Sequence, residues 1–128
     1  STAAPLATQM DEVRAPFRVR GDDLSRLFYF GESVLLAAYR GQGIGVRFFD
    51  EREAHARACG AVTAAFCAVV RPDDHSARPR AYVPLDAFWR RRGFVPAPGL
   101  ICRLSWREIG ASDESPKAMQ FWTKRLIP

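Results

Sequence analysis

Three glycines in five positions, Gly41, Gly43 and Gly45, form the segment of this chain best suited to chemistry. They stand between an apolar run at 27–36, which predicts a strand, and a helical pattern at 44–59. Glycine lets the backbone turn sharply and approach a ligand closely. The free N–H groups of the first helical turn point outward, and the positive end of the helix dipole favours an anion. The pattern therefore predicts a site for a phosphate or pyrophosphate.

Spacing excludes two common phosphate-binding motifs. A P-loop carries Lys and then Ser or Thr directly after its last glycine, whereas Val46 and Arg47 follow Gly45 here. A dinucleotide fingerprint needs Gly-x-Gly-x-x-Gly, which this spacing misses by one residue, and the chain has no room for a full set of βαβ repeats. A glycine-rich turn that binds no ligand stays open as an alternative.

The pattern Arg40-x-x-Gly43-x-Gly45 resembles motif A of the GNAT superfamily, the acetyl-CoA-dependent N-acetyltransferases. A second segment, residues 88–94 (Phe-Trp-Arg-Arg-Arg-Gly-Phe), resembles motif B of the same family, usually Phe-Tyr-x-x-x-Gly-Phe. It follows the glycine loop with one predicted strand between, as the family order requires. The resemblance covers residues 27 to about 108 and implies an α/β (α+β) fold. Its sheet would be mixed, mostly antiparallel and flanked by helices.

The resemblance assigns the cofactor site to the glycine loop and the strand before it. In GNAT proteins the loop cradles the pyrophosphate of coenzyme A. The strand splays away from its neighbour, and the pantetheine arm enters that gap and pairs with main-chain groups of the strand. The residues assigned to acetyl-CoA on this basis are Leu35, Leu36, Arg40, Gly41, Gln42, Gly43, Ile44 and Gly45. No metal site is implied.

Candidate catalytic residues flank this site. Glu32 lies on the predicted strand where a general base would face the substrate amine; an exposed or salt-bridged side chain is the alternative. The family's usual acid is the tyrosine of Phe-Tyr, but Trp89 stands there, and its indole N–H cannot act as an acid near neutral pH. Tyr82 or a water would replace it, unless the thiolate leaves without an acid. A polar loop at 71–80, whose alternative is a plain solvated loop, supplies the candidates for substrate contact, Asp73, Asp74 and His75.

The remaining pattern predicts the elements that position these residues. Helical periodicity predicts three helices, at 8–20, 44–59 and 117–126, and the resemblance to motif B implies a fourth at 85–92. Apolar runs predict one long strand at 27–36 with a bulge at Gly31, and a strand buried on both faces at 61–70. A closing hairpin is expected from residues 94–109, turned at 96–99. The expected domains are a partial GNAT domain at 1–110, with its cofactor strand and loop at 26–45, and a linker with an amphipathic helix at 111–128.

Composition is that of a single globular domain, with 48% hydrophobic and 26% charged residues in 128. No apolar run is long enough to span a membrane. Three cysteines without metal-ligand spacing favour reduced thiols in the cytoplasm, and Cys67 is expected in the core. The net charge of +5 suits a polyanion such as coenzyme A and also suits nucleic acid. Because no nucleic-acid motif accompanies the charge, nucleic acid is the third choice.

The resemblance also implies that part of the sheet is missing. A GNAT domain usually begins with a strand, one or two helices and two further strands, whereas only 26 residues precede Leu27. Because exposed sheet edges are avoided, we expect a homo-oligomer or a missing N-terminal segment. The implied activity is acetyl transfer from acetyl-CoA to a primary amine of a small molecule or peptide, by direct attack in a ternary complex. The alternative is a non-catalytic acyl-CoA-binding or assembly module.

Overall fold

The computed structural model describes residues 1–33, 35–70, 85–106 and 115–126. The strands are β1 (Ala3–Pro5), β2 (Leu27–Phe30), β3 (Thr63–Val69), β4 (Val95–Trp106) and β5 (Ser115–Arg125). The α-helices are α1 (Asp11–Arg20), α2 (Ile44–Ala58) and α3 (Asp86–Arg91), and short 3-10 turns lie at Leu6–Thr8, Leu24–Arg26 and Ala37–Tyr39. No helix in this part of the chain is long and apolar enough to cross a membrane.

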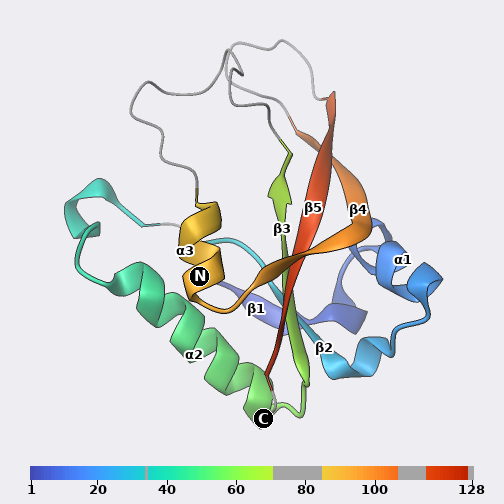
Figure 1. Ribbon diagram of the computed structural model, residues 1–128, viewed down its shortest axis with the longest axis horizontal. Coiled ribbons are helices and arrows are strands. Elements are labelled where there is room, and N and C mark those ends of the chain that lie inside the picture. The colour runs from blue at the N-terminus through green and yellow to red at the C-terminus, as the bar shows by residue number, and fades with distance from the viewer. Residues whose placement is uncertain (34, 71–84, 107–114, 127–128) are drawn as a thin grey trace.

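These strands form one five-stranded sheet in the order β1-β2-β3-β5-β4. Only β2 and β3 are parallel, and the other three neighbouring pairs are antiparallel. Helix α1 lies on one side of the sheet, and α2 and α3 lie on the other (Figure 1). The predicted fold class, a mixed and mostly antiparallel sheet flanked by helices, is therefore confirmed.

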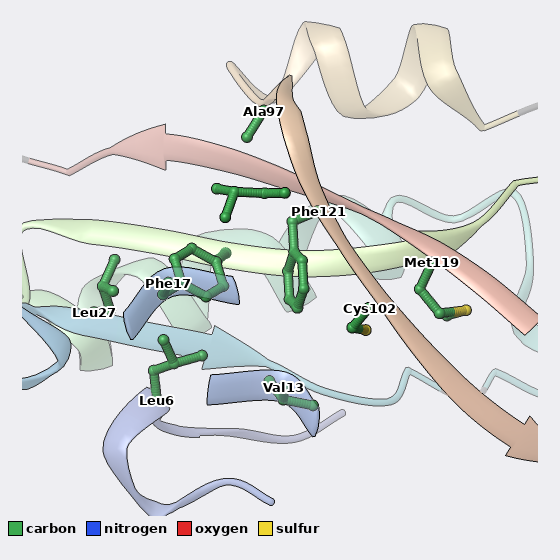
Figure 2. Close-up of a cluster of buried hydrophobic side chains, with 10 residues drawn as sticks. Leu6, Val13, Phe17, Leu27, Ala97, Cys102, Met119 and Phe121 are labelled. Atoms are coloured by element: carbon green, nitrogen blue, oxygen red, sulfur yellow. The ribbon is translucent and has the colours of Figure 1, made fainter. Parts of the chain in front are cut away.

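An apolar cluster on the α1 side, called the α1-face cluster, packs that helix against the sheet (Figure 2). Phe17 of α1 and Phe121 of β5 are both fully buried, and their rings meet edge to face with centroids 4.8 Å apart. The buried members of the cluster are Leu6, Val13, Phe17, Leu27, Ala65, Ala97, Leu100, Cys102, Met119 and Phe121. Because Val13 and Phe17 fix α1 from one side, the helix runs through Pro16 without ending there.

The opposite side of the sheet carries an aromatic cluster that holds α2 and α3. Phe94 is fully buried, and its ring centroid lies 5.1 Å from that of Phe66 and 5.4 Å from that of Phe49. The buried members are Phe28, Phe30, Phe49, Ala56, Ala61, Ala64, Phe66, Phe94, Trp122 and Leu126. Edge-to-face and tilted ring pairs of this kind add to the stabilisation that burial itself contributes. The sheet is therefore covered on both faces.

Helix α2, helix α3 and strand β3 lie where the sequence predicts a helix at 44–59, a helix at 85–92 and a strand at 61–70. The long strand predicted at 27–36 is wrong, because β2 ends at Phe30. Gly31 forms no bulge. It lies so close to the chain before β1 that a Cβ atom there would be 2.5 Å from the Thr2 hydroxyl oxygen, which explains the glycine.

The helix predicted at 117–126 is also wrong, because residues 117–125 belong to β5. β5 lies between β3 and β4 and pairs with both, and clusters on either side of the sheet cover its two faces. Phe121 contributes to the α1-face cluster, and its neighbour Trp122 contributes to the aromatic cluster. Apolar residues at consecutive positions hide the two-residue period of a strand and imitate a helical spacing. The predicted linker at 111–116 lies outside the described residues except for its last two, which begin β5.

The turn predicted at 96–99 is instead an irregularity within one strand. β4 runs continuously from Val95 to Trp106, and its register against β5 shifts inside this segment. The Gln120 amide Nε2 donates to the carbonyl oxygens of Ala97 at 2.7 Å and Leu100 at 3.2 Å. These bonds satisfy carbonyl groups that the shifted ladder leaves unpaired. β4 and β5, rather than two halves of 94–109, are the antiparallel pair that closes the sheet.

A buried ion pair fixes α2 to β5, and its removal is our first prediction. The Glu53 carboxylate is 5% exposed, and its Oε1 lies 2.8 Å from the Lys124 Nζ and 3.6 Å from the Arg57 Nη2. Glu53→Ala leaves the Lys124 ammonium largely buried without its counter-charge, so the free energy of unfolding should fall by about 2–4 kcal/mol. Urea titration followed by tryptophan fluorescence measures this loss. Glu51→Ala, on the exposed side of the same helix, is the matched control and should change stability by less than about 0.5 kcal/mol; equal losses would contradict the prediction.

Candidate functional site

The sheet opens between its two parallel strands. β2 and β3 pair over three residues only, and Tyr29 with Ala65 is the last pair. β3 continues beside β5 as far as Val69, while the chain after β2 stays with the β1 side, where the Gly31 N–H donates to the Thr2 carbonyl at 3.0 Å. Beyond Ala65, the β2-facing edge of β3 has no backbone hydrogen-bond partner among the residues described. The pairing of these two parallel strands therefore ends at Tyr29 and Ala65.

The glycine loop lies between the end of this gap and α2. Gly41 and Gly43 have φ angles of +78° and +79°, which residues with a side chain rarely adopt. A Cβ atom at either position would meet nothing within 4 Å, so backbone conformation rather than packing requires glycine there. Gly45 has a different role. A Cβ atom there would lie 3.7 Å from the ring of Phe88, which is an ordinary contact between α2 and α3.

The first turn of α2 presents free backbone donors to the loop. Arg47 is the first residue of this turn whose N–H is bonded, to the Gly43 carbonyl at 3.1 Å. The N–H groups of Ile44, Gly45 and Val46 have no partner in the described part of the chain. Gly43, which precedes the helix, has no side chain to cap them. This arrangement leaves the positive end of a 15-residue helix open to an anion.

Arg40 and Gln42, two side chains that the sequence assigns to the cofactor, form hydrogen bonds with backbone carbonyl groups of the loop segment. The Arg40 Nε donates to the Leu35 carbonyl at 3.2 Å, and the Gln42 Nε2 donates to the Ala38 carbonyl at 3.2 Å. The Leu36 carbonyl accepts the Tyr39 N–H at 2.9 Å. The carbonyl groups of residues 35 and 36 are therefore already bonded. In this conformation their N–H groups have no backbone partner among the residues that the structure describes.

The predicted catalytic and substrate residues are placed only in part. Glu32 is exposed, and its backbone pairs with Thr2, whose hydroxyl accepts the Glu32 N–H at 2.9 Å. The Glu32 carboxylate forms no ion pair with the other described residues. It therefore stands in solvent at the end of β2, next to the opening between the strands. Four further predicted residues lie outside the described residues: Tyr82, Asp73, Asp74 and His75.

Trp89, which occupies the position of the usual acid, packs into the aromatic cluster. Its ring centroid lies 4.9 Å from that of Phe66 and 5.1 Å from that of Trp122. Phe88 beside it contacts Phe49 of α2, with ring centroids 5.7 Å apart. The segment that resembles motif B therefore fixes α3 against the sheet and against the start of α2. It supplies packing to the site rather than a proton.

A second group of side chains, Tyr29, Cys67 and Cys102, lies on the α1 side of the same opening. The Tyr29 hydroxyl oxygen lies 3.3 Å from the Cys67 Sγ. Hydrogen bonding with Cys102 and also with Tyr29 lowers the pKa of the Cys67 thiol to about 7, against an opposing effect of burial. Cys67 is half-buried at the margin of the α1-face cluster, so its predicted place in the core holds only in part. Sequence reasoning missed this group, because only the strand register brings positions 29 and 67 together.

Comparison with known proteins bears on the fold. No protein-family model matches the sequence, and no curated protein matches it. Among solved structures, a nourseothricin acetyltransferase matches with a TM-score of 0.53 and 16% identity, over 80% of this chain and 52% of its own length. Ard1 from Thermoplasma volcanium matches with a TM-score of 0.53 and 12% identity, over 84% of this chain and 60% of its own. The chain thus spans little more than half of these proteins.

At these identities the similarity establishes the fold. The molecule has the GNAT fold, as the two sequence motifs predicted. Its β2, glycine loop, α2 and β3 form the parallel unit of this fold around the opening, and α3, β4 and β5 complete it.

Proposed function

We propose that this chain is an N-acetyltransferase that moves an acetyl group from acetyl-CoA to a primary amine. The observation that carries the proposal is the adjacency of two features, a gap between parallel strands and a glycine loop at an open helix N-terminus. Free strand edges bind an extended chain, and a helix N-terminus binds phosphate. Acetyl-CoA has both parts, an extended pantetheine arm and a pyrophosphate. The fold, shared with two acetyltransferases, supports the same proposal.

The proposed cofactor residues have distinct tasks. The N–H groups of the loop and of the first turn of α2, from Gly41 to Val46, would bind the pyrophosphate. Leu35 and Leu36 would offer their N–H groups to the pantetheine arm. Arg40 braces the loop through its Nε, and its remaining guanidinium N–H groups provide positive charge beside the phosphates. Binding both parts of acetyl-CoA orients the thioester for attack, which is where much of the rate would arise.

The proposed transfer is a direct attack of the amine on the thioester carbonyl in a ternary complex. Glu32, an exposed carboxylate beside the opening, would accept the ammonium proton directly or through water. Tyr82 is proposed as the acid toward the departing thiolate, since the indole N–H of Trp89 cannot act as an acid near neutral pH. Asp73, Asp74 and His75 are proposed contacts for the amine substrate, a small molecule or a peptide.

The cellular compartment of the chain and the covering of its sheet edge are also proposals. We place it in the cytoplasm because its three cysteines, Cys59, Cys67 and Cys102, are free thiols. β1 has only three residues and lies at the edge of the sheet. A second copy or a further N-terminal segment would cover this edge.

A second candidate function is acyl-CoA binding without turnover. The observation that favours it is the position of Trp89, whose ring packs against both Phe66 and Trp122 where the family usually has an acid. Such a module would bind the same ligand with the same loop. It is distinguished from an enzyme by the absence of thiol release when acetyl-CoA is mixed with a panel of primary amines.

Our second prediction tests the site itself. Acetyl-CoA at a hundred times its Kd should stabilise the folded chain by about 2.7 kcal/mol, because a ligand that binds only the folded state shifts the unfolding equilibrium. For a chain of this size, the gain raises Tm by about 10 °C in a thermal-shift titration. ATP, a polyanion without a pantetheine arm, is the control ligand. An equal shift with ATP, or no shift with acetyl-CoA, would reject the acetyl-CoA site.

A further inference from the structure

Tyr29, Cys67 and Cys102, which we call the thiol cluster, lie where the sheet opens. Tyr29 of β2 and Ala65 of β3 form the last pair between these two strands. Cys67 lies two residues beyond Ala65 in β3. Side chains alternate between the two faces of a strand, so positions 65 and 67 share a face. The Tyr29 hydroxyl reaches the Cys67 Sγ at 3.3 Å. The sulfur of Cys67 therefore lies beside the first stretch of β3 that β2 no longer covers.

The two neighbours of Cys67 are groups that keep their protons. Burial raises the pKa of the Tyr29 hydroxyl, and hydrogen bonding with Cys67 raises it further. The pKa of Cys102 is raised by its interaction with Cys67 and by burial. The Tyr29 hydroxyl and the Cys102 thiol thus each keep a proton that can be donated to the Cys67 sulfur, and such donation stabilises its thiolate form. Glu32 beside β2 and Glu12 of α1 are the charged groups that act on the cluster from the neighbouring elements.

Access separates Cys67 from the other cysteines. Cys102 is 5% exposed and lies in the α1-face cluster with Phe121 and Met119 (Figure 2). Cys59 is exposed at the end of α2, where only the His55 ring nitrogen, 3.7 Å away, approaches its sulfur. Cys67 alone combines two donors with a half-buried position next to the opening. A nucleophilic thiol needs both an anion-stabilising environment and access to the electrophile.

We propose that Cys67 is a self-acylation site, at which the thiol takes the acyl group of an acyl-CoA thioester when no amine acceptor is present. This inference rests on the proposed function, because it needs the thioester to lie between β2 and β3. The Cys67 thiol loses its proton, and its sulfur attacks the thioester carbonyl. The bond between that carbonyl and the coenzyme A sulfur breaks, and coenzyme A leaves as the thiol after taking up a proton. One thioester replaces another, so no oxidant or reductant is consumed.

The experiment, our third prediction, compares two acetyl donors by mass spectrometry of the intact chain and of its peptides. Acetyl-CoA at pH 7 without amine should add one acetyl group at Cys67, and neutral hydroxylamine should remove it, as it removes thioesters but not amides. Labelling should be at least about tenfold faster at Cys67 than at Cys59, because the rate follows the thiolate fraction. The rate at Cys67 should rise with pH around a midpoint near 7. p-Nitrophenyl acetate, which needs no coenzyme A site, should label the same residue.

Variants provide the controls. Tyr29→Phe removes one donor and should slow the labelling of Cys67 about three- to tenfold at pH 7, since a hydrogen bond to a charged group is lost. Cys67→Ser should abolish the label, and Cys59→Ser should leave it unchanged. Thermal unfolding of each variant shows whether it is folded. If both Cys67→Ser and Tyr29→Phe unfold, the comparison of acetyl-CoA with p-nitrophenyl acetate on the unmodified chain still tests self-acylation at Cys67.

The outcomes separate this inference from the proposed function. A thermal shift with coenzyme A, together with labelling of Cys67 by the ester but not by acetyl-CoA, overturns self-acylation and keeps the cofactor site. No thermal shift, with labelling by the ester only, overturns both the cofactor site and self-acylation by acyl-CoA, and leaves Cys67 as a reactive thiol alone. Absence of preferential labelling of Cys67 with either donor overturns the inference whatever the thermal shift shows.

Discussion

Phe94→Ala should lower the free energy of unfolding by about 3–5 kcal/mol, the largest loss of stability that we expect from one substitution in this chain. The Phe94 ring is fully buried at the centre of the aromatic cluster. Its centroid lies 5.1 Å from that of Phe66, 5.4 Å from that of Phe49 and 5.9 Å from that of Phe30. Truncation therefore removes three ring contacts and leaves a cavity between α2, α3 and the sheet. Because domains are only marginally stable, much of the folded population should be lost on warming.

Urea titration measures this loss, and the other phenylalanine of the same motif is the matched control. Phe88 is only half-buried and touches the rim of the cluster at Phe49. Phe88→Ala should cost about 1–2 kcal/mol, since less apolar surface returns to water. Equal losses at the two positions would mean that the cluster does not centre on Phe94. A loss below about 1 kcal/mol at Phe94 would contradict its burial.

These two positions explain what the second motif does. Its aromatic residues resemble a family signature in the sequence, and the structure places them in the core between α3, α2 and the sheet. Trp89 fits the same explanation, because its large ring fills space against Phe66 and Trp122. A motif therefore predicts an element and its position more securely than it predicts a chemical role. Here motif B predicts α3, and the site depends on it through packing.

Local signals predicted the elements around the site. α2 begins after glycines with positive φ and continues with a helical period, so its start could be predicted from neighbouring residues alone. β5 could not be predicted in this way. It is covered on both faces, and its sequence therefore lacks the alternation that identifies a strand. The end of β2 was missed for a related reason, since it depends on where β3 diverges and not on the apolar run itself.

The thiol cluster shows that a group of interacting side chains can be equally hard to predict from the sequence. Tyr29 and Cys67 are 38 residues apart in the chain and meet only because β2 and β3 are parallel in one particular register. No spacing within either strand encodes that register. Loop residues close together in sequence, such as Gly41 and Gly43, can be recognised as a site from the sequence. Groups assembled across strands become visible only in the folded molecule.

The largest functional effect is expected at Gly43, which precedes α2 with a φ angle of +79°. A side chain there would extend into the space next to the free N–H groups of Ile44 and Gly45, because nothing else lies within 4 Å of the Cβ position. Gly43→Trp should weaken acetyl-CoA binding at least about a hundredfold, since the bulky ring excludes the phosphates and the changed backbone re-aims their donors. Isothermal titration with acetyl-CoA measures the Kd.

Backbone strain must be separated from loss of the site, and the chain contains a matched control for this purpose. Gly21, at the end of α1, has a φ angle of +90° and open space around its Cβ position. Gly21→Trp therefore introduces comparable strain, about 1–2 kcal/mol, on the opposite side of the sheet from α2. Both variants should lose similar stability, but only Gly43→Trp should lose affinity. If the folded Gly43→Trp chain binds acetyl-CoA as tightly as the Gly21→Trp chain, the assignment of the glycine loop to the cofactor site is wrong. The reason is that the first turn of α2 cannot bind a pyrophosphate with an indole ring in front of it.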